Sequence, residues 1–223
     1  MEGYVDRLLD GGAVKVDVKG AALGSSAVII YSYDSGEMIS RECVVAKATK
    51  NGAEIDCKPF ALFNQDSVPV FVPPITRGDR VVFEPLSQSA IIIAPTIDRY
   101  VRAADRNKRL RLIHPDLFAI ALTKKSNPTP SQDDFSAFCD RQMAGVVILA
   151  LSDGDYVLDC QSFALLSVSA DNPSLLDEEV VMPFFHRLNE IGGGFFAGVK
   201  TVSPKDFDAY YKQLINKDFN AGN

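Results

Sequence analysis

The sequence predicts an α+β protein in which a small N-terminal β-barrel or sandwich precedes a mixed α+β part. Between residues 51 and 95, short β-type runs alternate with Gly and Pro, a pattern typical of all-β domains. After residue 96, longer runs of helix formers appear. The chain has 223 residues, of which 47% are hydrophobic and 23% charged, as in an ordinary folded domain. We therefore expect two domains, residues 1–96 and residues 97–223.

In the N-terminal part, alternation of apolar and polar residues and β-branched composition mark the strands. We expect them at residues 14–19, 27–33, 38–48, 53–57, 80–83 and 90–94. Asn51-Gly52 is a hairpin signal, because tight hairpin turns favour residues that tolerate positive φ. Residues 1–9 are expected to form a short helix, since their apolar side chains are spaced near 3.6 residues.

In the C-terminal part, helices and strands are mixed. His114-Pro115-Asp116 is typical of a helix start, and Ser131 is placed to cap another helix. We expect helices at residues 97–112, 117–125, 178–191 and onward from 131 and 203. We expect strands at residues 146–151, 156–168 and 195–202.

The charge and the termini restrict the partners. The net charge of −6 argues against a nucleic-acid ligand, which is bound through Lys and Arg. The only concentrated basic run, from Arg99 to Arg111, is interpreted as the solvated face of a helix. We expect no transmembrane segment, because no apolar run has the required length. The N-terminus lacks the pattern of a secretory signal, so we expect a cytoplasmic or cell-surface-associated protein.

The four cysteines are expected to be reduced and mostly buried. An even count permits two disulfides in three pairings. However, no CxxC motif occurs, and a chain of this size can be stable without disulfide cross-links. The spacing of Cys43, Cys57 and Cys160 matches no zinc template, so we expect no metal and no other cofactor.

An enzyme is the alternative function class. Cys139 with His114 or His186 could supply a thiol nucleophile and a base, as in a hydrolase-like enzyme. The competing interpretation is a helix-face cysteine packed with Phe135 and Phe138. We favour that second interpretation and therefore expect a non-enzymatic binding or scaffolding module with no catalytic residues.

Several sequence stretches indicate a family. They are residues 60–62, 65–69, 73–74, 78–81, 90–95, Tyr100, 114–118 and 157–159. In these stretches the chain resembles the N-terminal domain of the bacterial plasminogen-binding protein A family. The resemblance covers roughly residues 14–200. The resemblance implies a protein partner, namely host plasminogen bound at the bacterial surface.

Two features are candidate partner-binding sites. The proline-rich crossing with Pro69, Pro73 and Pro74 is either a binding ridge or a wide surface connection. Lys217 precedes Asp218 and so pairs an ammonium with a carboxylate, which plasminogen's kringle modules recognise in a terminal lysine. An internal pair is a poorer mimic, because its geometry cannot adapt freely. We therefore expect weak plasminogen binding, and partner binding mainly through the β part.

Overall fold

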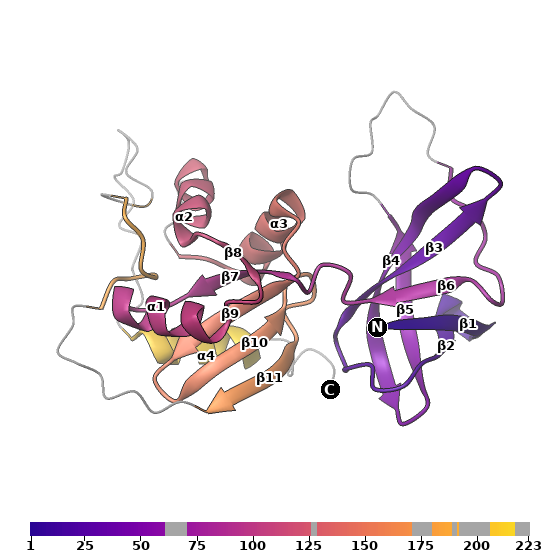
Figure 1. The fold of residues 1–223 in the computed structure, drawn as a ribbon, viewed down its shortest axis with the longest axis horizontal. Coiled ribbons are helices and arrows are strands. Elements are labelled where there is room, and N and C mark those ends of the chain that lie inside the picture. The colour runs from indigo at the N-terminus through magenta and orange to yellow at the C-terminus, as the bar shows by residue number, and fades with distance from the viewer. Residues whose placement is uncertain (61–70, 126–128, 171–179, 189–190, 192–205, 217–223) are drawn as a thin grey trace. The chain divides into compact units, whose positions relative to one another are not determined.

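The structure, a computed structural model, consists of two compact units, Met1–Pro85 and Leu86–Asn223 (Figure 1). It describes residues 1–60, 71–125, 129–170, 180–188, 191 and 206–216. The first unit is a closed β-barrel and the second combines a sheet with helices. The predicted α+β class with an N-terminal barrel is confirmed.

The barrel closes in the order β1-β2-β5-β4-β3-β6, and all its pairings are antiparallel. Its strands are β1 (Glu2–Leu8), β2 (Val14–Asp17), β3 (Ser26–Tyr33), β4 (Gly36–Thr49), β5 (Gly52–Pro59) and β6 (Arg80–Phe83), with a short 3₁₀ turn at Asp10–Gly12. Alternate residues of each strand point inward, so that Val16, Ile29 and Ile55 are fully buried in one apolar core.

The predicted helix at residues 1–9 is wrong, because this segment is strand β1. Its exposure alternates with a period of two, with Gly3 and Val5 buried and Tyr4 exposed. Pairing with both β2 and β6 closes the barrel and outweighs the local helical spacing. Gly3 is required here, since a Cβ atom would lie 2.7 Å from the Asp17 carbonyl oxygen.

The hairpin predicted at Asn51-Gly52 exists, but its turn differs from the expected one. Thr49 pairs with Gly52, so Gly52 is the first residue of β5 and Lys50-Asn51 form the turn. Gly52 is not among the glycines with positive φ. A Cβ atom at Gly52 would lie 3.1 Å from the Val16 carbonyl oxygen, so close packing against β2 explains the glycine.

The second unit contains a five-stranded sheet in the order β11-β10-β9-β7-β8 (Figure 1). Strands β7, β8 and β9 are parallel, and β10 and β11 continue the sheet antiparallel. The elements are β7 (Ser89–Ile93), α1 (Ile97–Arg106), β8 (Arg111–Ile113), α2 (Pro115–Lys124), α3 (Gln132–Gln142), β9 (Val146–Leu151), β10 (Gly154–Asp159), β11 (Leu165–Ala170) and α4 (Phe207–Asn216).

Strand β7 lies in the interior of this sheet, and its side chains belong to two cores, one on each face. Ile92 faces a core with Ala103 of α1, whereas Ile91 faces a core with Phe118 of α2 and Phe135 of α3. All five β7 residues are buried, as expected for a parallel strand covered on both faces. The expectation that residues 90–94 complete the barrel is therefore wrong.

Three other predicted elements differ from the structure. The helix expected over residues 97–112 ends at Arg106 and is followed by β8. The strand expected over 156–168 is divided by a turn between β10 and β11. The helix expected over 178–191 is wrong, because residues 180–188 are not helical. The strand expected at 195–202 lies outside the described residues.

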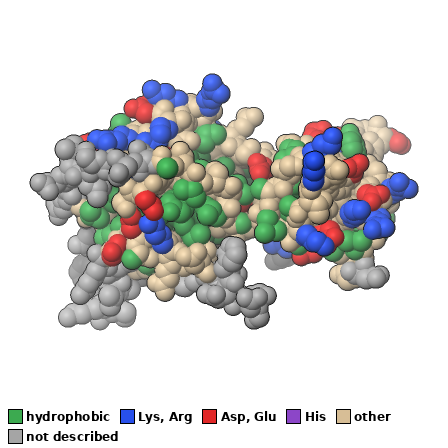
Figure 2. Space-filling model, turned by 90° about the horizontal axis from the view of Figure 1, so that it is seen from below, with side chains coloured by type: hydrophobic (Ala, Val, Ile, Leu, Met, Phe, Trp, Pro, Cys, Tyr) green, Lys and Arg blue, Asp and Glu red, His purple; other side chains and the backbone are tan. Residues whose placement is uncertain are grey.

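Exposed apolar side chains also occur on the second unit. Leu165 and Val168 of β11 are among them. Figure 2 views the molecule from below Figure 1, where β11 lies, and hydrophobic side chains gather on the face seen there. Among the described residues, no helix is long and apolar enough to span a bilayer.

Candidate functional site

The described end of the proline-rich crossing begins at Phe71 and lies on the barrel. Pro73 is buried, and its carbonyl oxygen accepts a hydrogen bond of 2.8 Å from Arg41 Nη2 of β4. Pro74 is exposed. Pro69 and Lys217, the other predicted partner-binding residues, lie outside the described part of the chain. The structure thus fixes the last part of the crossing to the barrel wall.

A small surface with two aromatic residues lies next to the Arg41–Pro73 hydrogen bond. We call it the Phe71 ridge (Tyr31, Phe71, Val72 and Pro74). The Phe71 side chain is 63% exposed and Val72 is exposed next to it. The rings of Phe71 and Tyr31 of β3 meet edge to face, with centroids 6.0 Å apart. An exposed aromatic ring that rests on a partly buried ring, next to a proline fixed by an arginine hydrogen bond, loses little conformational freedom when a partner binds. The sequence predicted the prolines but not the two aromatic residues.

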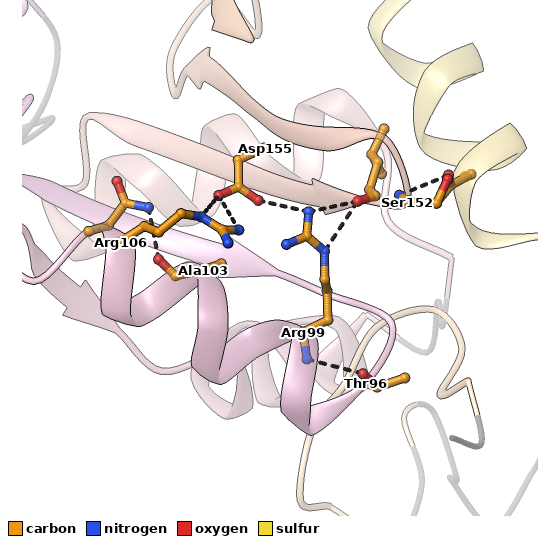
Figure 3. Close-up of polar contacts among 9 residues, drawn as sticks. Thr96, Arg99, Ala103, Arg106, Ser152 and Asp155 are labelled. Carbon is orange, nitrogen blue, oxygen red and sulfur yellow. Dashed lines mark hydrogen bonds and ion pairs between the residues drawn. The ribbon is translucent and has the colours of Figure 1, made fainter. Parts of the chain in front are cut away.

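In the second unit, a buried ion network joins α1 to the β9–β10 hairpin (Figure 3). Arg99 donates to Asp155 Oδ1 at 3.0 Å and, through two nitrogens, to the Leu151 carbonyl oxygen. Arg106, about two helical turns further along, donates to Asp155 Oδ2 at 2.8 and 2.6 Å. Thr96 caps the helix by accepting from the Arg99 backbone N–H at 3.2 Å. Asp155 therefore ties two turns of α1 to β10.

This network corrects the interpretation of the basic run as a solvated helix face at one residue, Arg99. Arg99 is buried and Arg106 is turned toward Asp155. Arg111 donates to the carbonyl oxygen of Met143, beyond the helix. The basic residues of the run other than Arg99 are exposed. Arg99 alone is buried as part of the internal packing, which sequence spacing did not reveal.

Helix α4 is attached to the same hairpin by polar contacts. The Asp208 carboxylate accepts hydrogen bonds from the Ser152 backbone N–H, at 3.0 Å, and from its hydroxyl. Lys212 Nζ lies 2.7 Å from Asp153 Oδ2, and this bond holds the pKa of Asp153 below its usual value. Tyr211 of α4 is fully buried, and burial raises its pKa well above 10. The polar contacts attach α4 to the hairpin, and Tyr211 belongs to the core that contains Phe118 and Phe135.

Both histidines of the chain lie beside Asp116, at the start of α2. His114 Nδ1 accepts the Asp116 backbone N–H at 3.2 Å and so caps the helix. The Asp116 carboxylate accepts from the Arg187 backbone N–H at 2.9 Å and from its Nε at 2.8 Å. His186 Nδ1 is buried and has no hydrogen-bond partner among the described residues. The His114 ring packs against Tyr100, with centroids 5.5 Å apart.

Burial governs the ionisation of these groups. It lowers the pKa of His114 and of His186 below the usual 6.5, although the Asp116 carboxylate acts in the opposite direction on both. Burial would also raise the pKa of Asp116, but the hydrogen bonds from Arg187 outweigh it and lower that pKa. The three groups therefore favour neutral histidines beside a charged aspartate.

The cysteines form two disulfides, so the expectation of reduced thiols is wrong. Cys43 of β4 is joined to Cys57, its direct cross-strand partner on β5, with Cα atoms 4.1 Å apart. Cys139 of α3 is joined to Cys160, just after β10, with Cα atoms 5.9 Å apart. Cys139 therefore has no free thiol, which removes the nucleophile of the enzyme alternative. Spacing could not reveal these pairs, because both depend on strand and helix packing.

No metal-binding group of three or more His, Cys, Asp or Glu side chains occurs within the described ranges.

The rings of Phe135 and Phe138 pack against Phe118, with centroids 4.5 and 5.0 Å away. They thus belong to the same core as Cys139, which was the competing interpretation of this cysteine.

Comparison with known proteins gives one consistent result. The model of the family described as "Plasminogen-binding protein pgbA N-terminal" matches residues 8–215. The plasminogen-binding protein PgbA of Helicobacter pylori strain J99 is 24% identical over 200 residues, which are 88% of this chain and 43% of that protein. The PgbA of strain 26695 is 23% identical over the same shares. The chain thus corresponds to less than half the length of these relatives. It belongs to the family of the PgbA N-terminal domain.

Proposed function

We propose that this chain is a non-enzymatic protein-binding module and that its partner contacts the barrel at the Phe71 ridge. The observation that carries the proposal is the exposed Phe71 ring, which meets the partly buried Tyr31 ring edge to face beside the bond between Arg41 and the Pro73 carbonyl oxygen. Interface hot spots are enriched in aromatic side chains that insert into pockets of the partner. The oxidised state of Cys139 further disfavours the thiol-enzyme alternative.

The family name suggests plasminogen as the partner. The two Helicobacter pylori relatives have that name, and each is more than twice as long as the region that matches this chain. We propose that this domain binds plasminogen weakly by itself and contributes the ridge contact to a larger interface. The exposed lysines Lys58 and Lys108, paired with Glu42 and Asp105, are further groups that a kringle module could engage.

Surface binding measurements with plasminogen test this function. The Phe71→Ala variant should bind at least about tenfold more weakly than the wild type, as expected for a hot-spot residue. Leu23→Ala is the matched control, because Leu23 is a comparably exposed apolar residue (58%) of the same unit. It should change the affinity less than about twofold.

The lysine route is tested in the same format. Binding that a lysine analogue abolishes and that disappears in Lys217→Ala would show that a lysine contact, rather than the ridge, carries the interaction. If plasminogen binds and neither Phe71→Ala nor Lys217→Ala changes its affinity, the partner uses another surface and the ridge proposal is wrong. If plasminogen does not bind, capture of another protein from an extract that depends on Phe71 would keep the ridge and exclude plasminogen.

We also propose a cell-surface rather than cytoplasmic location. Both disulfides support it, because such bonds persist in oxidising compartments and are rare in the cytosol. Alkylation of intact cells followed by mass spectrometry tests the proposal: the cysteines should be oxidised in the native organism. Four alkylated cysteines would place the protein in a reducing compartment.

A further inference from the structure

The segment of residues 180–188, which we call the strap, covers a defined edge of the second sheet. The Val181 backbone N–H donates to the Pro95 carbonyl oxygen at 2.8 Å, and that of Phe185 donates to Ala94 at 2.7 Å. Ala94 and Pro95 directly follow β7. The strap is therefore bound to the carboxyl end of the central parallel strand.

This edge is where open α/β sheets bind ligands. The chain passes from β7 through α1 to β8 on one side, and returns through α2 and α3 to β9 on the other side. The helices lie on opposite faces, since α1 and α2 pack against different cores of the sheet. Such a change of direction opens a crevice outside the carboxyl ends of the strands. Here the strap occupies that position.

In addition to these backbone bonds, an apolar anchor, an ionic contact and a tyrosine hydrogen bond hold the strap. Phe184 is fully buried and its ring stacks on Phe118 of α2, with centroids 5.5 Å apart and planes at 15°. Arg187 binds Asp116 through its backbone N–H and its Nε atom. The Pro183 carbonyl oxygen accepts from the Tyr211 hydroxyl at 2.9 Å. Asp116 is thus the charged residue on α2 that retains the strap.

Both histidines of the protein interact electrostatically with that single carboxylate. His114 lies on the α2 side, with Nδ1 3.3 Å from Asp116 Oδ1. His186 belongs to the strap, and its Nδ1 is buried without a partner among the described residues. Its imidazole meets the Phe184 ring edge to face, with centroids 5.9 Å apart. Burial lowers the pKa of His186 more than the Asp116 carboxylate and the Leu188 backbone raise it, so a proton on this ring is disfavoured while the strap is docked.

Protonation of His114 would weaken the same contact. A protonated Nδ1 can no longer accept the Asp116 backbone N–H, so α2 would lose its N-cap. The new imidazolium would also compete with Arg187 for the Asp116 carboxylate. The charged and titratable groups around the two rings are Asp116, Arg187 and Tyr100. Asp116 is the only acid among these three, and it is already bonded to Arg187.

We propose that the strap is an acid-released cover, which detaches from the carboxyl end of β7 when His114 and His186 become protonated. The released strap exposes the Ala94 and Pro95 carbonyl groups and the Phe184 site on α2. The sign follows from the lowered pKa values of both histidines. A group with a lower pKa in the docked state binds its proton more readily after release. Docking is therefore complete above pH 6.5 and weakens as the pH falls below it.

Histidine NMR tests the premise directly, because the two imidazoles give only two Cε1–H signals. Both should titrate below 6.5 in the folded protein. Amide hydrogen exchange, corrected for its intrinsic pH dependence, tests release. Exchange at Val181 and Phe185 should rise between pH 7.4 and pH 5, by up to about tenfold for each unit by which release raises a histidine pKa. Amides of β4 and β5 are the internal control, since the barrel unit contains no histidine.

The double variant His114→Asn/His186→Gln removes both titrating groups, and Asn retains a favourable N-cap. It should show the same strap exchange at pH 7.4 and pH 5. The proposal is overturned if wild-type strap amides exchange equally at both pH values, or if the double variant keeps the pH dependence. If the variant does not fold, the wild-type titration still decides: midpoints at or above 6.5 for both histidines contradict acid release.

Discussion

The Arg99 guanidinium lies 3.0 Å from the Asp155 carboxylate, and the two side chains are only 3% and 4% exposed. Arg106 binds the second carboxylate oxygen, so that one aspartate serves two arginines of α1. Removing one partner of a buried ion pair leaves the other charge without compensation. This contact therefore contributes to stability differently from the ion pairs on the surface.

Asp155→Ala should lower the free energy of unfolding by about 3–5 kcal/mol, because it removes a buried carboxylate that is ion-paired with Arg99. The matched control is Asp105→Ala on the same helix, where Asp105 forms an exposed pair with Lys108. That change should cost less than about 1 kcal/mol. Urea denaturation of both variants measures the difference, and equal losses would contradict a structural role for the buried pair.

A second prediction concerns the cysteines. Thiol counting on denatured, non-reduced protein that has been oxidised to completion should find no free thiol, and reduction should release all four. The Cys43→Ser/Cys57→Ser variant should lose about 3 kcal/mol of stability, the value expected for a loop of about 15 residues. The reduced wild type is the control. Cross-links in another pairing, read by peptide mapping, would contradict the structure.

The contact of α4 with the β9–β10 hairpin gives a third prediction. Asp208→Ala should cost about 1–3 kcal/mol, because the backbone N–H and the hydroxyl of Ser152 lose their acceptor. Asp133→Ala is the control, since Asp133 lies exposed in the first turn of α3. It should change stability by less than about 1 kcal/mol. Similar losses in the two variants would show that the hairpin contact adds nothing specific.

A fourth prediction tests the packing before β9. Gly145→Ala should destabilise strongly, since the new Cβ atom would lie 2.3 Å from the Leu86 carbonyl carbon and only backbone movement could relieve the overlap. We expect a fall in melting temperature of at least several degrees, the shift that about 1–2 kcal/mol produces. Ser169→Ala, at an exposed position of β11, is the control. An unchanged melting temperature for Gly145→Ala would refute this packing.

Local patterns in the sequence predicted part of the fold. Alternation identified most barrel strands, and Ser131 caps α3 as expected, with Asp134 completing the capping box. The failures have a common cause. Tyr4 and Val5 suggested a helix, yet barrel closure makes them a strand, and Ala90 belongs to a parallel strand whose partners are 20 or more residues away. Pairing between distant segments decided these elements, and a single local window does not contain that information.

The site was predicted less completely than the fold. The prolines of the sequence pointed to the crossing, but the contact between Phe71 and Tyr31 joins residues 40 positions apart in the sequence. The convergence of His114 and His186 on Asp116 likewise depends on the strap lying beside α2. The barrel disulfide pairs residues that strand register places opposite each other, which composition cannot show.

Each disulfide stays within its own unit. Cys43 and Cys57 belong to the unit that ends at Pro85, whereas Cys139 and Cys160 belong to the next one. All four cysteines of the chain are thereby used, so a single stretch of backbone is the only covalent connection across Pro85–Leu86. A protease cut at that junction would yield two fragments that part on a denaturing gel without reductant. In evolution, either unit could be inherited or exchanged separately while keeping its own cross-link.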